Sequence, residues 1–122
     1  VGVIGNFRGK EDYVLPVIEI KSSDRGILSH DMRMESEYAF VGGGLRPAER
    51  EQLSQFAKKL HHSFGAEDYS QSEFIVDKQG KIWFIEMDTQ PHLHESSPFL
   101  IALKSVGATL AEFVKSIINK KQ

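Results

Sequence analysis

Three carboxylates, Glu73, Glu86 and Asp88, lie in a short stretch whose other residues are mostly typical of β-strands. The stretch, residues 70–88, reads as two strands joined by turn residues at 77–81. Like charges crowded on one face of a hairpin repel one another unless a cation lies between them. Carboxylate oxygens are the ligands that hard divalent ions such as Mg²⁺ prefer. The pattern therefore predicts a candidate magnesium site.

Whether these carboxylates share a face depends on the register of the hairpin. A four-residue loop, residues 78–81, would pair Val76 with Trp83 and would place Glu73 opposite Glu86. The third carboxylate, two positions further along, would then lie on the same face. A three-residue loop would move Glu73 to the other face and would remove the site. The alternative is that the acidic residues simply form the solvated face of the hairpin.

The composition is that of an ordinary globular domain. The 122 residues are 40% hydrophobic and 26% charged, with a net charge of −2, which predicts a single domain over residues 1–122. The absence of cysteine excludes disulfides and suits a cytoplasmic protein. No basic stripe predicts a nucleic-acid partner, and no apolar run predicts a membrane segment. Because the chain opens in an expected strand without a methionine, we expect a fragment of a longer chain.

Strands are expected at residues 1–7 and 13–20, ahead of the acidic hairpin. The polar residues from Arg8 to Asp12 are expected to end the first strand. Pro16 interrupts the second strand and belongs at a sheet edge or a bulge, since it cannot donate a backbone hydrogen bond. Residues 27–41 are weakly patterned and are expected to be mostly loop.

Three helices are expected, each with a recognisable start. Pro47 opens the first, which runs to about residue 64 and ends at Gly65. Ser97 caps a short second helix, and Thr109 opens the third with a capping box. The first and third helices are expected to bury Leu53, Phe56, Ala57, Leu60 and Phe64, and Leu110, Phe113, Val114, Ile117 and Ile118. The order of elements predicts an α+β fold, an antiparallel sheet covered by helices.

Two other polar patterns admit a functional and a plain interpretation. His92, His94 and Glu95 could chelate zinc, but no partner cluster is evident elsewhere, and polar loop residues are the favoured interpretation. The three glycines at 42–44 precede a helix and could cradle a phosphate. They lack the lysine and the spacing of a P-loop, so a flexible loop is favoured.

The order of the elements resembles the carboxy-terminal part of the ATP-grasp fold, in the form found in D-alanine–D-alanine ligases. The stretch FIEMDTQPHLHESS, residues 84–97, is similar to that family's Phe-Leu-Glu-Val-Asn-Thr-x-Pro-Gly-Met-Thr-x-x-Ser. Five positions match outright: Phe84, Glu86, Thr89, Pro91 and Ser97. The resemblance extends over nearly the whole chain.

The resemblance implies an ATP-dependent carboxylate–amine ligase of the kind that makes peptidoglycan precursors. ATP phosphorylates one carboxylate in that family, and an amine then attacks the acyl phosphate. The cofactors implied are ATP and Mg²⁺ or Mn²⁺, and the family's metal ligands fall on Glu73, Glu86 and Asp88. The implied partners are a small amino-acid or dipeptide-type substrate and the missing amino-terminal and central subdomains of the same chain. A homodimer is one assembly that the resemblance allows.

The same resemblance implies roles for four further residues. Arg33 falls where the family has a lysine that contacts the ATP phosphates, and an arginine can hold phosphate with a different geometry. Ile27 and Ile85 fall on apolar contacts to adenine. Ser97 matches the hydroxyl that holds the carboxylate of the second substrate.

Two positions depart from the family pattern. Gln71 stands where the family has an arginine that stabilises the tetrahedral intermediate, and an amide brings no charge to a developing oxyanion. His92 stands where the family has a glycine whose backbone N–H faces the substrate. These departures favour either a different substrate or a degenerate ATP-grasp domain that binds or scaffolds without ligase activity. A structural α+β module with a coincidental resemblance is a third hypothesis.

Overall fold

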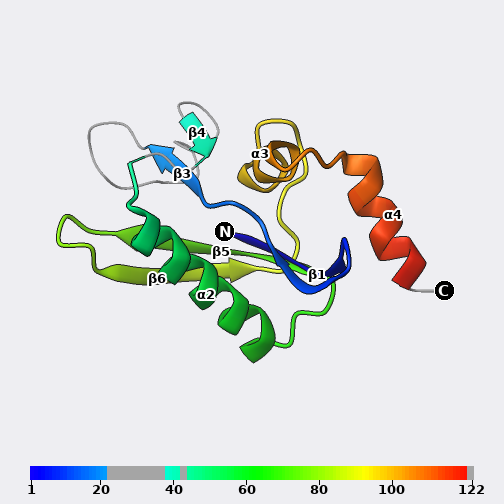
Figure 1. The fold of residues 1–122 in the computed structure, drawn as a ribbon, viewed down its shortest axis with the longest axis horizontal. Coiled ribbons are helices and arrows are strands. Elements are labelled where there is room, and N and C mark those ends of the chain that lie inside the picture. The colour runs from blue at the N-terminus through cyan, green and yellow to red at the C-terminus, as the bar shows by residue number, and fades with distance from the viewer. Residues whose placement is uncertain (22–37, 42–43, 121–122) are drawn as a thin grey trace.

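The computed structural model describes residues 1–21, 38–41 and 44–120. Within this part of the chain, four antiparallel strands form one sheet in the order β2-β1-β5-β6, and two more form a small separate sheet (Figure 1). The larger sheet contains β1 (Gly2–Phe7), β2 (Lys10–Val14), β5 (Tyr69–Val76) and β6 (Ile82–Asp88). The smaller sheet pairs β3 (Ile18–Lys21) with β4 (Tyr38–Val41).

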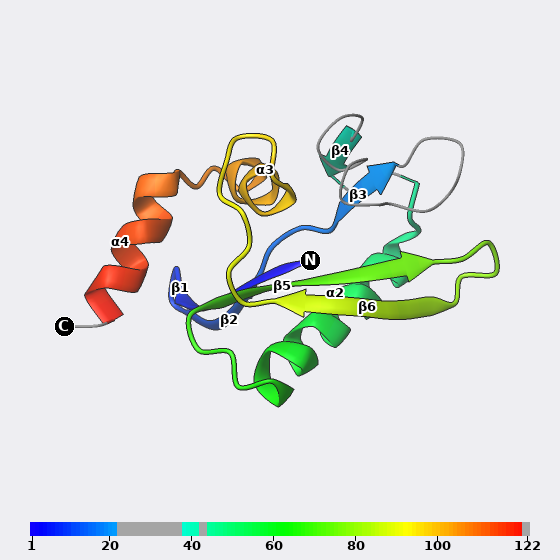
Figure 2. The same ribbon diagram turned by 180° about the vertical axis from the view of Figure 1, so that it is seen from behind.

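Helices lie on both sides of the larger sheet. Helix α2 (Pro47–Ser63) runs along one side, and α3 (Pro98–Ser105) lies on the other, as the two opposite views show (Figures 1 and 2). Helix α4 (Leu110–Lys120) lies beyond the end of the sheet formed by β1 and β2. The expected α+β fold, an antiparallel sheet covered by helices, is therefore confirmed.

The amino-terminal strands differ from the expectation. The polar segment expected to end the first strand instead turns at Arg8 and Gly9, whose φ angles are 50° and 77°, and continues as β2. The expected strand at 13–20 is broken, because β2 ends before Pro16 and β3 begins after it. The expectation of a loop was also wrong for residues 38–41, which form β4. Pairing with a distant strand, β3, stabilises this extended backbone, and such pairing leaves little local signal.

The helix boundaries agree with the expected caps. The Ser97 hydroxyl accepts a hydrogen bond from the Leu100 N–H at 3.4 Å, and the Thr109 hydroxyl accepts one from the Glu112 N–H at 3.0 Å. The Glu112 carboxylate does not complete a capping box, because it forms a two-point ion pair with the Arg8 guanidinium at 2.7 and 2.9 Å. This pair ties α4 to the β1–β2 turn.

The core lies between the larger sheet and helices α3 and α4, and its buried side chains include Ile4, Phe7, Leu15, Phe99, Leu103 and Phe113. The predicted burial of α4 was largely wrong: Phe113 is buried, but Leu110, Val114 and Ile118 are 39–51% exposed. A helix that covers only the end of a sheet buries one narrow stripe. None of the helices in the described part of the chain is long and apolar enough to cross a membrane.

The burial expected for α2 was wrong for Phe64 and did not include His61. Leu53 and Ala57 are buried as expected, but Phe64 is 60% exposed, because it lies just past the end of the helix. His61 is buried in its place, and its Nδ1 lies 2.7 Å from the Ser70 hydroxyl on β5. Burial lowers the pKa of His61, because an imidazolium loses hydration there, although the nearby Asp12 carboxylate acts in the opposite direction.

Acidification is expected to destabilise the protein through His61. Because its pKa is lower in the folded than in the unfolded state, the unfolded state binds more protons below about pH 6.5. The free energy of unfolding should therefore fall as the pH drops from about 6.5, by at most about 1.4 kcal/mol per pH unit, until the folded pKa is reached. Urea unfolding of the full-length protein between pH 5 and 8 measures this slope.

His61→Gln should flatten the curve over this range, because glutamine can keep the hydrogen bond to Ser70 but does not titrate. His94→Gln, at an exposed histidine in a loop, is the matched control and should leave the slope unchanged. Equal slopes in wild type and His61→Gln would show that this histidine does not set the pH dependence.

Candidate functional site

The loop of the acidic hairpin has three residues rather than the expected four. The Asp77 N–H donates to the Lys81 carbonyl at 2.9 Å, and Val76 pairs with Ile82, so the predicted pairing of Val76 with Trp83 was wrong. The Asp77 carboxylate stabilises this tight loop by accepting a hydrogen bond from the Lys81 N–H at 2.9 Å. That hydrogen bond, followed by one from the Trp83 indole, lowers the pKa of Asp77.

A β-bulge restores the register that the short loop would have lost. Phe74 pairs with Phe84, and Glu73, the residue before Phe74 on β5, pairs with Glu86. Ile85 is therefore an extra residue on β6. The predicted pairing of Glu73 with Glu86 is therefore confirmed, although a bulge rather than the loop length produces it. The two carboxylates lie opposite each other on neighbouring strands.

Asp88 extends this acidic pair along the hairpin. It pairs with Gln71, and by strand alternation both lie on the face of Glu73 and Glu86. Its Oδ1 accepts a hydrogen bond from the Gln90 N–H at 2.8 Å, which fixes the start of the following loop. Among the residues that the structure describes, no three His, Cys, Asp or Glu side chains are close enough to form a complete protein cage for a metal ion.

The paired carboxylates of Glu73 and Glu86 fit Mg²⁺ by their chemistry. This ion is usually held by one or two carboxylates, with water and substrate phosphates as the remaining ligands, rather than by a cage of protein side chains. Two ionised side chains directly opposite each other are also unfavourable without a cation. The hairpin could therefore supply the protein ligands of a metal–nucleotide complex.

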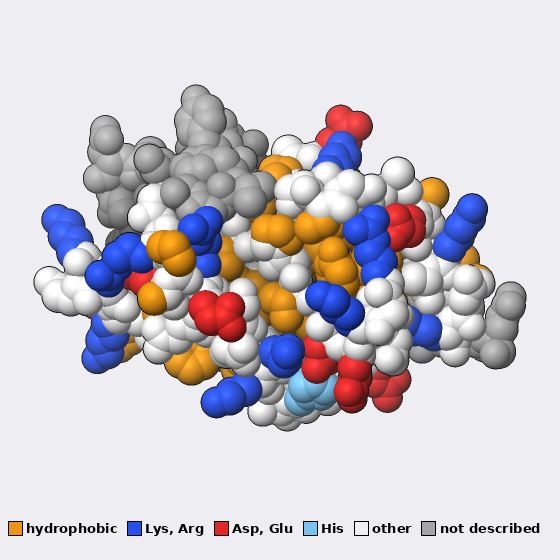
Figure 3. All heavy atoms as spheres, viewed as in Figure 1, with side chains coloured by type: hydrophobic (Ala, Val, Ile, Leu, Met, Phe, Trp, Pro, Cys, Tyr) orange, Lys and Arg blue, Asp and Glu red, His pale blue; other side chains and the backbone are white. Residues whose placement is uncertain are grey.

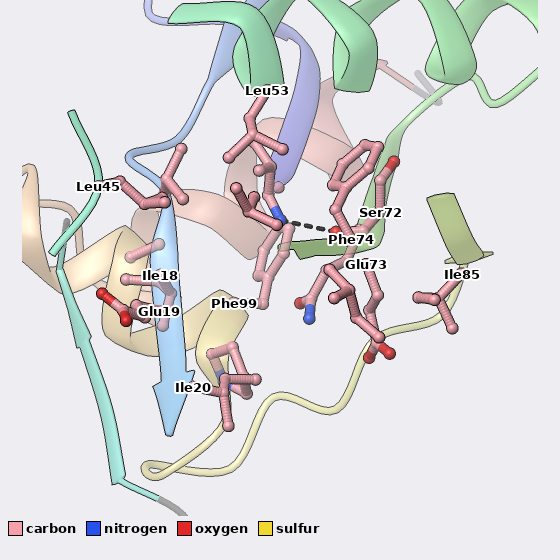
Figure 4. A pocket seen from close by; sticks show the side chains of 18 residues that line it. Ile18, Glu19, Ile20, Leu45, Leu53, Ser72, Glu73, Phe74, Ile85 and Phe99 are labelled. Atoms are coloured by element: carbon pink, nitrogen blue, oxygen red, sulfur yellow. Dashed lines mark hydrogen bonds between the residues drawn. The ribbon is translucent and has the colours of Figure 1, made fainter. Parts of the chain in front are cut away.

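A cavity of about 480 Å³ lies between β5 on one side and β3 and Leu45 on the other, and residues of α3 also line it (Figure 4). Its walls are largely apolar and include Ile18, Ile20, Leu45, Ile75, Ile85 and Phe99. Apolar side chains also come to the surface in the middle of the face seen in Figure 3, with Lys and Arg nearby. The size and lining of the cavity are those of a small-molecule site.

The polar side chains of the cavity carry oxygen acceptors. Glu19 on β3 and Glu73 on β5 contribute carboxylates, and Gln71 and Ser72 contribute neutral groups. The Gly44 N–H donates to Glu19 at 2.6 Å. Val1 also lines the cavity, where its backbone nitrogen donates to the Ser72 carbonyl at 2.7 Å.

Gln71 and Ser97 are the two buried residues among those predicted to contact the substrate, and Ser97 is the more deeply buried. Gln71 is 9% exposed, and its Oε1 has no hydrogen-bond partner among the described residues. Its neighbours Ser70 and Ser72 are also buried, and Ser70 faces His61 of α2. Strand alternation therefore directs Gln71 to the opposite face, where Tyr69 packs on Phe99.

The loop from Thr89 to Ser97 brings the other predicted substrate residues together. The Ser97 hydroxyl donates to the His94 carbonyl at 2.7 Å and is 2% exposed, so this side chain also holds the loop to the start of α3. The rings of His92 and His94 lie 5.8 Å apart, and the Ser96 hydroxyl lies 3.0 Å from His94 Nδ1. His92 is exposed at the tip of this loop.

The three predicted nucleotide contacts are only partly placed. Ile85 lines the cavity as the extra residue of the bulge, whereas Ile27, Arg33 and the glycines at 42–43 lie outside the described residues. Sequence reasoning missed Glu19, which lies in the cavity wall. An acidic residue inside the apolar run LPVIEI was the signal that could have identified it.

The sequence matches a family model described as "D-ala D-ala ligase C-terminus" over residues 1–119. A D-alanine–D-alanine ligase from Bordetella avium is 28% identical over 120 residues, which are 97% of this chain and 37% of the relative. One from Pseudoalteromonas translucida is 27% identical over 89% of this chain and 36% of the relative. The chain thus spans little more than a third of the length of these curated relatives.

Solved structures show the same fold at low sequence identity. D-alanyl-alanine synthetase A from Vibrio cholerae matches 98% of this chain and 37% of its own, with a TM-score of 0.80 and 18% identity. A D-alanine–D-alanine ligase from Bacillus anthracis complexed with ATP has a TM-score of 0.70, also at 18% identity, over 97% of this chain and 36% of its own. Family model, relatives and fold agree, and this chain is a member of the D-Ala–D-Ala ligase carboxy-terminal family.

Proposed function

We propose that this chain is the carboxy-terminal part of an ATP- and Mg²⁺-dependent ligase that joins a carboxylate to an amine. Glu73 and Glu86 would hold the metal, with Asp88 beside them, and Ile85 would contact adenine. Gln71, His92 and Ser97 would border the substrate. The observation that carries the proposal is the pairing of Glu73 with Glu86 across the bulge, next to the cavity.

The reaction would proceed in two steps. A substrate carboxylate oxygen attacks the γ-phosphorus of ATP and ADP leaves. The amine nitrogen then attacks the acyl carbon, the C–O bond to phosphate breaks, and a proton leaves the nitrogen. Mg²⁺, when bound, would neutralise charge on the phosphate oxygens. The hairpin would hold Glu73 and Glu86 rigidly on neighbouring strands, and the apolar walls would exclude water from the reacting groups.

Mg²⁺-dependent binding of ATP to the full-length protein tests this proposal. Calorimetric titration should detect ATP binding with Mg²⁺, and Glu86→Gln should weaken that binding roughly tenfold or more, about 1.4 kcal/mol, because one charged ligand is lost. Glu51→Gln, on α2 away from the cavity lining, is the matched control and should bind like wild type. Equal affinities for wild type and Glu86→Gln would exclude Glu86 as a metal ligand.

A second candidate function is binding without catalysis, in a degenerate ATP-grasp domain. The neutral Gln71, in place of the family's arginine, favours it, because an uncharged amide stabilises a developing oxyanion less well. Phosphate release from ATP by the full-length protein, screened over pairs of amino acids, separates the two candidates. Nucleotide binding without phosphate release for every pair would favour the binding role.

A further inference from the structure

Helix α4 carries an apolar stripe that the described residues leave about half exposed. Leu110, Val114 and Ile118 are 39%, 40% and 51% exposed. They follow one another at intervals of four residues, so they lie along one side of the helix. The adjacent side buries Phe113 completely and packs Ile117 against the core. The apolar face of α4 is therefore wider than the part of it that the rest of the described chain covers.

The orientation of α4 is fixed, so the helix cannot roll to bury this stripe. The Arg8 guanidinium holds the Glu112 carboxylate near the start of the helix through two hydrogen bonds of 2.7 and 2.9 Å. At the other end of the helix, the Lys120 ammonium donates to the Gly5 carbonyl. Phe113 lies between these two anchors and is fully buried. Rotation of α4 about its axis would break all of these contacts, so the stripe is a rigid surface.

The stripe also lies away from the candidate site. Helix α4 is beyond the end of the sheet formed by β1 and β2, whereas the loop of the acidic hairpin points toward the opposite end of the molecule (Figures 1 and 2). The described lining of the cavity contains none of the three stripe residues. A nucleotide, metal ion or substrate at the hairpin would leave the stripe exposed, so the proposed ligase site does not account for it.

The part of the full-length protein that precedes this region is the occupant that fits the stripe best. The match with the Bordetella avium ligase covers 37% of that relative, and the matched family model describes a carboxyl terminus, so most of such a protein precedes the matched region. Packed domains of one chain bury about 600–1,500 Å² against each other. The stripe supplies a rigid apolar centre for such an interface, with the exposed Lys115 at its edge.

A second copy of the chain fits the stripe less well. Three half-exposed aliphatic side chains offer on the order of 200 Å² of apolar surface, whereas a stable interface between molecules buries about 800 Å² on each partner. Two separate molecules also lose translational and rotational freedom when they associate. A domain that is already joined to this chain loses much less freedom, so a small apolar stripe is enough to hold it.

We propose that the stripe of Leu110, Val114 and Ile118 on α4 is the docking surface for the amino-terminal part of the same full-length chain. The docked part covers the stripe with apolar side chains and fixes the carboxy-terminal part relative to the rest of the protein. This contact needs neither nucleotide nor metal nor substrate. The proposal therefore does not depend on the ligase function, which the binding of ATP and Mg²⁺ tests separately.

Thiol labelling of cysteine variants of the full-length protein tests this docking. Val114→Cys replaces a stripe residue with one of similar size, and Asn119→Cys is the matched control at an exposed position on the other side of α4. A maleimide should label Val114→Cys at least tenfold more slowly than Asn119→Cys at every protein concentration, with the modified peptide identified by mass spectrometry. Equal labelling rates for the two variants would overturn the proposal.

The dependence on concentration and a crosslink identify the occupant. If a second copy covered the stripe, labelling of Val114→Cys would slow as the protein concentration rises, and that result would also overturn the proposal. A benzophenone attached through Lys115→Cys, at the edge of the stripe, captures the neighbouring surface on illumination. Its crosslinks should join position 115 to residues that precede this region in the same molecule, with isotope-labelled protein mixed in to identify links between copies. Links to a second copy only, or none outside these 122 residues, would contradict the docking.

Discussion

Replacing Phe99 with alanine is expected to lower the free energy of unfolding by about 3–5 kcal/mol, the range for aromatic truncations in protein cores. Phe99 is 1% exposed, and its ring lies 5.8 Å from that of Tyr69 and 5.3 Å from that of Phe113. It therefore joins α3 to the sheet and to α4. Truncation would remove these contacts and leave a void that the surrounding strands cannot close.

Urea unfolding of the full-length protein measures this loss, and Phe64→Ala is the matched control. Phe64 is the same residue type but is 60% exposed, so its truncation should change the free energy of unfolding by less than about 1 kcal/mol. Because Phe99 also lines the cavity, its truncation should weaken ligand binding there as well. Similar losses for the two variants would contradict the assignment of Phe99 to the core.

Gly5→Ala is expected to destabilise the protein by about 3 kcal/mol, the upper end of the cost of overpacking a well-packed interior. A Cβ at this position would lie 2.5 Å from the backbone oxygen of Glu67. The clash is with backbone rather than with a flexible side chain, so relief requires β1 to move away from the segment before β5. That movement would also strain the hydrogen bond from the Gly5 N–H to the Asp68 carbonyl, now 2.9 Å.

Gly44→Ala provides the control for this prediction. No atom of the residues that the structure describes lies within 4 Å of a Cβ at Gly44, and the residue is exposed. The substitution should therefore be neutral or slightly stabilising, because alanine restricts the unfolded chain. Differential scanning calorimetry of the full-length protein compares the two variants, and equal melting temperatures would refute the steric argument.

Local chemistry made the helices predictable. Pro47, Ser97 and Thr109 define helix starts through contacts within one turn, and Gly65 and Gly107 follow the helix ends with φ angles of 69° and 75°. Such signals act between residues a few positions apart, so a sequence displays them directly. The acidic hairpin was recognisable for the same reason.

Contacts between distant residues were not predictable in this way. His61 is buried through a hydrogen bond to Ser70 on another element, and α4 leaves Leu110, Val114 and Ile118 exposed because it meets only the end of the sheet. A hydrophobic pattern shows which face of a helix can be buried. It does not show how much of that face a neighbour covers.

The sequence by itself determined the α+β class, the helix caps, the family resemblance and the presence of three carboxylates on one hairpin. Only the tertiary structure decided how two of them meet. The short loop alone would have moved Glu73 off the face of Glu86, and the extra residue, Ile85, restores the pairing. Tertiary packing also placed Gln71 and Glu19 in the lining of one cavity. Their strands, β5 and β3, are far apart in the chain, and only folding brings the two strands to opposite sides of that cavity. Strand register and cavity walls are set by packing between elements, and that information is distributed over the whole chain.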